Sequence, residues 1–233
     1  MRDHLVFIPG FTCTRELWEA QIAHLRDRYD ITIGDHRNDN SIAAIAERIL
    51  AASPTRFSLA GLSMGGYIAL EIIARAPERI ERLALLDTQA TPETPDARKT
   101  RLQRLDVARK DGVRAAAELN LPRFVHPARI DDAPLRAKIL RMAEDTGLAA
   151  WERQTQAIMD RPDARPNLGA ISVKTLVLVG DRDEVTPPER AHEMASAIPG
   201  ATLVEIAQCG HLSTIERPDS VNRALDDWLR TPA

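Results

Sequence analysis

The amino-acid sequence predicts an α/β fold, with an open and mostly parallel sheet of about six strands and helices on both faces. Short continuous apolar runs are typical of strands that are covered on both sides, as in a parallel sheet. Segments with helical periodicity lie between these runs, so strand and helix alternate along the chain. A charged stretch interrupts the alternation once, which indicates an inserted helical cap.

The expected elements follow from these patterns in chain order. Four continuous apolar runs predict strands, and two weaker runs predict two further strands. Pro9 and Gly10 end the first run, as turn-forming residues do. The expected strands are 5–8, 31–33, 57–60, 83–86, 175–179 and 202–206, and the expected helices are 16–28, 42–50, 64–75, 189–197 and 221–229.

The segment 90–168 breaks the pattern, because it is rich in charge and its helical periodicities are interrupted by prolines. Proline-containing stretches at 91–95 and 161–166 bound it, and a residue before proline is steered away from helical geometry. We therefore divide the chain into an α/β core, residues 1–89 and 169–233, and a helical cap insertion, residues 90–168. The cap follows the end of a strand, so we expect it to lie over the crevice at that edge of the sheet.

Composition excludes several classes of protein. With 233 residues, of which 44% are hydrophobic, the chain can bury one sizeable core. Its 31 basic and 34 acidic side chains form no long run of one sign, which argues against nucleic acid or an anionic membrane as a partner. No stretch approaches the roughly 20 apolar residues of a membrane span, and the apolar start is too short for a signal peptide. We expect a soluble cytoplasmic protein that is a monomer or a homodimer.

The segment 61–66, whose sequence is GLSMGG, joins a predicted strand to the helix that follows it. A Gly-x-Ser-x-Gly string in this setting is the pattern of a nucleophile elbow, in which a sharp turn exposes the serine at the carboxyl edge of the sheet. Gly61 and Gly65 suit such a turn, because larger side chains there would collide. We therefore predict that Ser63 is a nucleophile. The alternative is a serine that caps the helix beside glycines needed for packing.

A serine hydroxyl needs a base to remove its proton, and the base needs an acid that orients it. In an elbow of this type the order along the chain is serine, acid, histidine. Asp183 and His211 each follow a predicted strand, so both reach the same sheet edge as Ser63. Asp87 follows another strand and Asp181 lies two residues before Asp183, and both remain alternative acids. For the histidine, a structural role as a cap of the last helix is the alternative.

The turn after the first strand is expected to help stabilise the negative charge that develops on the substrate carbonyl oxygen. We expect the backbone N–H groups of Phe11 and Met64 to form an oxyanion hole, and Gly10 permits the chain geometry that this requires. Trp18, on the next helix, is a candidate substrate contact, although core packing is the simpler role.

Nothing in the sequence indicates a metal site. Cys13 and Cys209 have neither the spacing of metal ligands nor the number needed for a disulfide framework. His192 and Glu193 lie on a predicted helix, but Ser196 stands where a second helical histidine would be needed.

These motifs resemble the α/β-hydrolase superfamily over essentially the whole chain. The matches are Pro9-Gly10-Phe11, the Ser63 elbow, Gly180 with Asp183, and Gly210-His211 before the last helix. The chain is most similar to small capped serine hydrolases, which include enol-lactone hydrolases, carboxylesterases and cofactor-free perhydrolases. The resemblance implies an enzyme without cofactor that cleaves a small-molecule carboxylic ester, lactone or related acyl bond through an acyl-enzyme on Ser63.

Three features depart from the pattern of the superfamily. Pro9-Gly10 replaces the usual His-Gly before the oxyanion residue, and the segment 35–38, DHRN, replaces a glycine-rich loop. The two antiparallel strands that often precede the first apolar strand are not expected here.

Other functions of the fold remain as alternatives. A C–C bond lyase or synthase and a perhydrolase are non-hydrolytic members, and small-molecule receptors also use this fold. The menaquinone-pathway synthase typically carries an arginine four residues after the nucleophile, where this chain has Tyr67, which disfavours a lyase. Turnover of an activated ester would separate a hydrolase from a receptor.

Arginines in the cap suggest the kind of substrate. Arg123, Arg153 and Arg161 lie near apolar neighbours, and arginine suits bidentate recognition of a carboxylate. We therefore expect the cap to select a small polar or anionic substrate, with Arg153 as the preferred contact. The alternative is that these arginines solvate an outer face.

Overall fold

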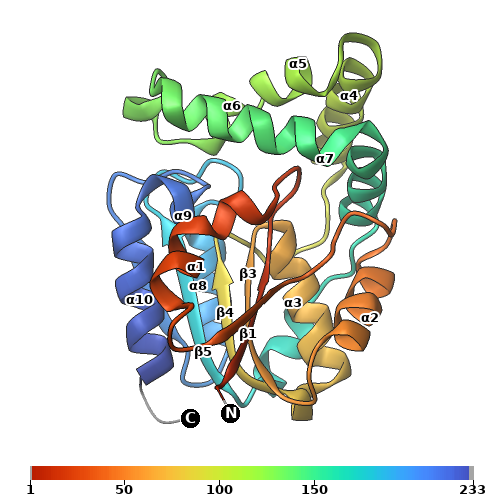
Figure 1. The fold of residues 1–233 in the computed structure, drawn as a ribbon. Coiled ribbons are helices and arrows are strands. Elements are labelled where there is room, and N and C mark those ends of the chain that lie inside the picture. The colour runs from red at the N-terminus through yellow and green to blue at the C-terminus, as the bar shows by residue number, and fades with distance from the viewer. Residues whose placement is uncertain (1, 231–233) are drawn as a thin grey trace.

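The structure, a computed structural model, describes residues 2–230, which form a fully parallel six-stranded sheet between two layers of helices (Figure 1). The strands are β1 (His4–Ile8), β2 (Asp30–Ile33), β3 (Phe57–Leu62), β4 (Ile80–Leu86), β5 (Lys174–Gly180) and β6 (Thr202–Ile206), in the spatial order β2-β1-β3-β4-β5-β6. Every neighbouring pair is parallel, so all strands end at one edge of the sheet. The predicted fold class is confirmed, with each expected strand in place.

Helices cover both faces of the sheet (Figure 1). One face carries α1 (Glu19–Leu25) and α10 (Pro218–Arg230), and the other carries α2 (Ile42–Ala52), α3 (Met64–Arg75) and α8 (Pro188–Ala197). In β1, Leu5 and Phe7 belong to one apolar cluster, whereas Val6 and Ile8 belong to the other, and all four are fully buried. Successive side chains of a strand point to opposite faces, so a strand covered on both sides is apolar at every position.

The first expected helix, 16–28, differs from the structure. The chain forms a 3-10 turn at Arg15–Trp18 and then α1, which ends at Leu25. At Trp18 the backbone leaves the helical region, with φ −106° and ψ 9°, and its indole stacks on Phe7 with ring centroids 4.4 Å apart. Near the other end, a short helix α9 (Ser213–Glu216) precedes α10, which begins three residues before the expected start at 221.

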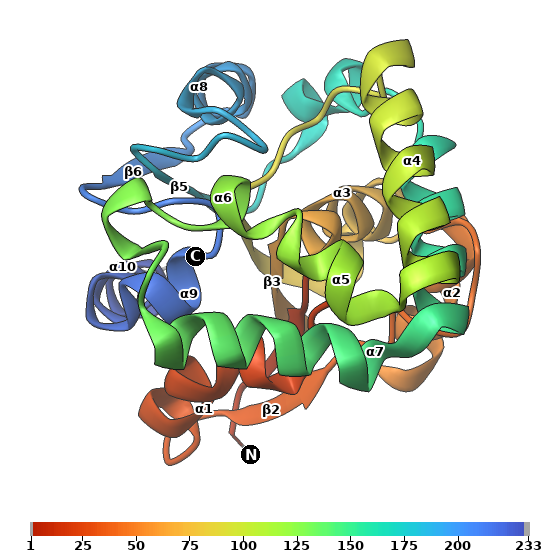
Figure 2. The same ribbon diagram turned by 90° about the horizontal axis from the view of Figure 1, so that it is seen from above.

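Four helices follow β4 and lie above the carboxyl ends of the strands, on the viewer's side in Figure 2. They are α4 (Pro95–Asp111), α5 (Val113–Glu118), α6 (Leu121–Phe124) and α7 (Ala133–Met159). Gly147 interrupts α7 with φ 73° and ψ 164°, so the chain changes direction there. Within residues 2–230, no helix is both long and apolar enough to cross a membrane.

Candidate active site

Ser63 lies in a strained turn between β3 and α3. Its φ of 55° and ψ of −115° are unusual for a residue with a side chain, and such strain concentrates at functional sites. A Cβ atom on Gly61 would lie 2.2 Å from the Gly65 carbonyl oxygen, and a Cβ on Gly65 would lie 2.1 Å from the Ile8 carbonyl oxygen. Only glycine fits at both positions, and the serine hydroxyl is thereby held at the carboxyl edge of the sheet.

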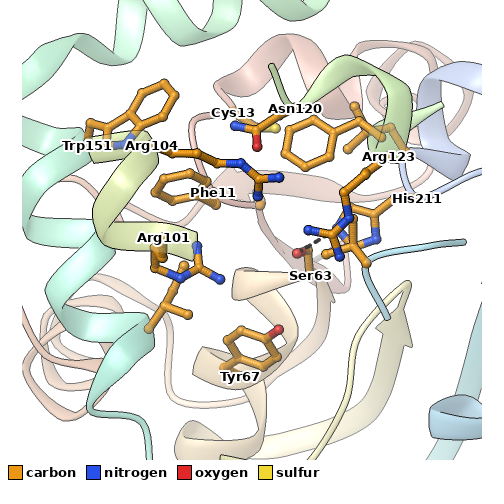
Figure 3. A pocket seen from close by; sticks show the side chains of 15 residues that line it. Phe11, Cys13, Ser63, Tyr67, Arg101, Arg104, Asn120, Arg123, Trp151 and His211 are labelled. Carbon is orange, nitrogen blue, oxygen red and sulfur yellow. Dashed lines mark hydrogen bonds between the residues drawn. The ribbon is translucent and has the colours of Figure 1, made fainter. Parts of the chain in front are cut away.

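A chain of hydrogen bonds connects Ser63 to a buried carboxylate. His211 Nε2 lies 2.8 Å from Ser63 Oγ (Figure 3). On its other side, His211 Nδ1 lies 2.8 Å from Asp183 Oδ2. The loop after β6 carries His211 and the loop after β5 carries Asp183, so three strand ends supply the three groups. All three side chains are buried, which strengthens the electrostatic interactions among them.

Asp183 is fixed by its own loop. Its Oδ1 accepts the backbone N–H groups of Val185 at 2.8 Å and Thr186 at 2.9 Å, and its Oδ2 accepts the Thr186 hydroxyl at 2.7 Å. These donors stabilise a carboxylate and leave it aimed at His211 Nδ1.

The two alternative acids make other contacts. Asp87 Oδ1 accepts the Gly180 N–H at 3.0 Å, and its Oδ2 accepts the N–H and hydroxyl of Ser213. Burial and the charge of Asp183 raise the pKa of Asp87 well above its ordinary value, which favours the neutral acid. Asp181 Oδ1 accepts the N–H of Cys209 at 3.0 Å. The structure therefore brings Asp183 to the histidine, whereas the other two carboxyl groups hold the surrounding loops.

The expected oxyanion donors lie beside the serine. Met64 is the first residue of α3, where backbone N–H groups have no acceptor within the helix. Within residues 2–230, the Phe11 N–H donates to no acceptor, and Gly10 and Phe11 line the same cavity as Ser63. Both N–H groups are thus available to a negative charge that develops next to Ser63.

The cavity over Ser63 contains some of the expected substrate contacts and excludes others (Figure 3). Arg123 lines it, with Nη2 donating to the Glu184 carbonyl at 2.8 Å. Trp18 does not line it, because its indole is buried against Phe7 beneath the sheet edge.

Arg153, the contact preferred from the sequence, is not among the residues that line the cavity either. Its Nε donates to the Arg37 carbonyl at 2.8 Å, and the residue is half-buried. On α7 the cavity is lined by Trp151 and Ile158, seven residues apart and so on one helical face. Arg153 is two residues from Trp151 and therefore points to a different side of the helix.

Four polar residues in the cavity were missed by the sequence analysis: Tyr67 of α3, Arg101 and Arg104 of α4, and Asn120 before α6. In the sequence, Tyr67 is informative only because it stands where the menaquinone-pathway synthase has an arginine. Helix α4 carries charged residues on every side, so its periodicity gave no sign of which arginines face inward. The arginines that face the cavity can be told from those that face solvent only once the position of α4 above the sheet is known.

Other reactive groups near the site have no evident catalytic use. Burial raises the pKa of Cys13 to about 12 and the pKa of Cys209 further still, so both thiols are neutral near pH 7. Within residues 2–230, no three side chains of histidine, cysteine, aspartate or glutamate are grouped so as to hold a metal ion.

A parallel α/β sheet with a serine, a histidine and an aspartate linked at its carboxyl edge is the architecture of the α/β hydrolases. A sequence profile described as the alpha/beta hydrolase fold matches residues 3–218. The chain therefore belongs to the α/β-hydrolase fold family, and it is an enzyme of that family.

Individual relatives are similar over nearly their whole length. The chain is 25% identical to 3-oxoadipate enol-lactonase 2 of Acinetobacter baylyi, across 98% of this chain and 89% of that protein. The enol-lactonase from Burkholderia xenovorans superimposes with a TM-score of 0.90 at 28% identity, covering 99% of this chain and 92% of the other. A thermophilic esterase from Thermogutta terrifontis, solved with malate bound, gives a TM-score of 0.88 at 29% identity, covering 98% and 89%.

Proposed function

We propose that this enzyme is a serine hydrolase that cleaves a small-molecule carboxylic ester or lactone. The observation that carries the proposal is the pair of 2.8 Å contacts that link Asp183, His211 and Ser63 in one line. Similarity to enol-lactonases and an esterase supports the same class of bond.

Each group of the site has a separate role in the formation of the acyl-enzyme. His211 Nε2 takes the proton of Ser63 Oγ while that oxygen attacks the acyl carbon. The carbonyl oxygen becomes negative and accepts the N–H groups of Phe11 and Met64, each worth about 3 kcal/mol of barrier lowering in comparable sites. When the tetrahedral intermediate collapses, the C–O bond breaks and His211 returns the proton to the leaving oxygen. In an ester the alcohol departs, whereas in a lactone it stays attached to the acyl group.

Water then completes the cycle. His211 removes a proton from water, the hydroxide attacks the acyl-enzyme, and Ser63 leaves with the proton that His211 returns. Asp183 stabilises the positive imidazolium in both halves of the reaction. In this proposal the segment 90–168 acts as a cap, because its helices lie over the sheet edge that carries Ser63 (Figure 1) and thereby limit access to small substrates.

A labelling experiment tests the covalent step. The wild type is expected to hydrolyse short-chain methyl esters and to gain one phosphonate adduct at Ser63, measured by peptide mass spectrometry. Ser63→Ala should fold normally, take up no label and lose roughly 10⁴-fold or more of turnover. Ser196→Ala, an exposed serine on α8, serves as the matched control and should behave like the wild type.

Four outcomes would contradict the proposal. Labelling at a residue other than Ser63, or wild-type turnover by Ser63→Ala, would rule out an acyl-enzyme on Ser63. Ligand binding without any turnover would indicate a receptor. A lyase would convert its substrate without consuming water, which isotopic oxygen in the product would reveal.

A further inference from the structure

We propose that Arg101, Arg104 and Arg123 form a carboxylate-binding site at the mouth of the Ser63 cavity, so that the substrate carries a free carboxylate apart from the acyl bond that is cleaved. This inference rests on the proposed function and names the class of substrate. Figure 3 shows Arg101 and Arg104 reaching into the cavity from α4, with Arg123 on the side of His211.

The three arginines stand where two cavities meet. They line the cavity that contains Ser63, and they also line a wider cleft that opens outward between the start of α4 and the loop before α8. Arg101 and Arg104 are three residues apart on α4 and so share a helical face. A substrate that moves from the cleft to Ser63 therefore passes all three guanidinium groups.

Nearby acids balance only part of their positive charge, and the two that line the wider cleft are Glu93 and Asp96. No aspartate or glutamate lines the Ser63 cavity. Glu93 lies 3.4 Å from Arg101, but it also pairs with the buried Arg161. Arg123 donates only to a backbone carbonyl, and Arg104 has no hydrogen-bond or ion-pair partner among residues 2–230.

The guanidinium groups affect one another. Burial, together with the charges of Arg123 and Arg101, lowers the pKa of Arg104 from its ordinary value. Arg101 also retains a buried Nε–H without a hydrogen-bond partner, while its guanidinium lies 5.3 Å from the centre of the Phe11 ring. An anion at this point would relieve the repulsion and satisfy the free donors, and a carboxylate matches the planar fork of arginine.

The inner cavity indicates what joins the carboxylate to the reacting carbonyl. Phe11 and Trp151 meet edge to face in its wall, with centroids 5.1 Å apart, and Phe124 lies 5.7 Å from the His211 ring. These aromatic walls favour a short apolar linker between the two ends of the substrate.

A matched pair of esters tests the site. Monomethyl succinate and methyl butyrate differ in one carboxylate, and their hydrolysis is followed by acid release. We expect the wild-type kcat/KM to be at least tenfold higher for the anionic ester, and we expect Arg104→Gln to reduce this ratio at least tenfold. Arg109→Gln, on the same helix but exposed and paired with Glu152, is the control and should preserve the ratio.

A binding measurement separates this inference from the proposed function. Calorimetric titration of Ser63→Ala with succinate should show binding that the added Arg104→Gln change weakens at least tenfold. If neither ester is hydrolysed but succinate binding depends on Arg104, the hydrolase proposal fails and the anion site stands. Equal kcat/KM for both esters, or an Arg104→Gln variant with the wild-type ratio, would overturn the anion site and leave the hydrolase intact.

We also infer, from different contacts, that His36 is a positioning residue for the oxyanion hole of the proposed hydrolase. His36 Nε2 lies 3.0 Å from the Gly10 carbonyl oxygen, which also accepts the Cys13 N–H at 3.1 Å. The Gly10 carbonyl and the Phe11 N–H belong to one planar peptide group. Fixing the oxygen therefore fixes the direction in which the N–H points.

Helix α7 holds the same turn from the other side. Gln154 Oε1 accepts the Thr12 N–H at 2.9 Å, and its Nε2 donates to the His36 carbonyl at 3.4 Å. Both Gln154 and His36 are buried, so these bonds form in a medium of low dielectric constant.

Two substitutions of His36 separate positioning from stability. His36→Gln keeps an N–H donor near the Nε2 position, whereas His36→Met fills similar space without a donor. We expect His36→Met to lower kcat at least tenfold with KM within threefold, and to weaken a boronic acid inhibitor that binds Ser63 by a similar factor. His36→Gln should retain most of the wild-type kcat and most of the wild-type affinity for the boronic acid. Equal effects of the two substitutions, or unchanged boronate affinity in His36→Met, would overturn this role, and absence of boronate binding to the wild type would count against the proposed hydrolase itself.

Discussion

Asp183 and Asp87 are buried carboxyl groups at the ends of neighbouring strands, but they differ in their hydrogen-bond partners and in the charge that lies near them. Three donors besides His211 stabilise the charge of Asp183. Asp87 also accepts three hydrogen bonds, but burial and, after it, the charge of Asp183 raise its pKa well above the ordinary value, which favours the neutral acid. The same residue type thus orients the histidine at one position and holds the surrounding loops at the other.

This contrast leads to a prediction for two isosteric changes. Asp183→Asn removes the charge that orients and stabilises the His211 imidazolium, so we expect kcat to fall on the order of 10⁴-fold. Asp87→Asn changes a carboxyl group that makes no contact with His211 and whose pKa is raised by burial, so we expect kcat to fall by at most about tenfold. Steady-state kinetics on a methyl ester check both, with thermal melting as the control for folding. If Asp87→Asn were the more damaging change, the acid of the site would belong to β4.

The residues of the site differ in how far the sequence could predict them. Ser63, Asp183 and His211 are set by local strings next to strands, and their convergence follows from the parallel order of the sheet. Arg101 and Arg104 were not predicted, because the few apolar residues of α4 are surrounded by charged ones on every side and its helical periodicity is weak. The direction in which α7 crosses the sheet is a tertiary property, so the sequence could not show that Arg153 would lie outside the lining of the Ser63 cavity.

At the scale of elements, the buried strands were the most predictable. A strand covered on both faces must be apolar throughout, and that requirement is visible in a short run of sequence. The helix expected at 16–28 was less accurate, because stacking of Trp18 on Phe7 and the break at Trp18 depend on the sheet below. The 27-residue α7 was not foreseen as one element, since Gly147 interrupts its helical pattern.

Gly147 gives a prediction about this helix. Its φ of 73° and ψ of 164° lie in a region that only glycine adopts readily, although a Cβ atom there would meet nothing within 4 Å. Gly147→Ala should therefore lower the free energy of unfolding by about 1–3 kcal/mol through backbone strain alone. Gly169→Ala is the matched control, because its nearest contact would be 4.0 Å away and its φ is not positive. Urea unfolding measures both, and equal stability of the two variants would contradict the argument.

At the scale of the molecule, the helices above the sheet are tied to the core by polar contacts at several points. Gln154 of α7 contacts the turn after β1, and Arg141 of α7 pairs with Glu16 at 2.7 Å. Arg129, between α6 and α7, donates to the Glu216 carbonyl at 2.5 Å, in α9. Opening of the cavity by movement of these helices would therefore break buried as well as exposed bonds. The buried contact of Gln154 is the more costly one to lose, because exposed ion pairs contribute little.

His36 also makes the stability of the whole fold depend on pH. Burial lowers the pKa of His36 from 6.5 to about 4, despite the favourable hydrogen bond to the Gly10 carbonyl. Between these two values the unfolded chain binds a proton at this residue and the folded chain does not. Stability that is present above the unfolded pKa is therefore lost as the pH falls from about 6.5 towards 4, by about 3 kcal/mol in all.

Removal of the imidazole isolates this contribution. Asp87 and Glu216, whose pKa values are raised mainly by burial, act in the opposite direction, but they are present in both the wild type and His36→Gln. We therefore expect the free energy of unfolding of the wild type to decline more steeply than that of His36→Gln between pH 6.5 and 4, with the two curves converging at the acid end. Urea unfolding at several pH values in this range measures the difference. Parallel curves would show that His36 titrates alike in the folded and unfolded chain, and burial would then no longer account for a lowered pKa of His36.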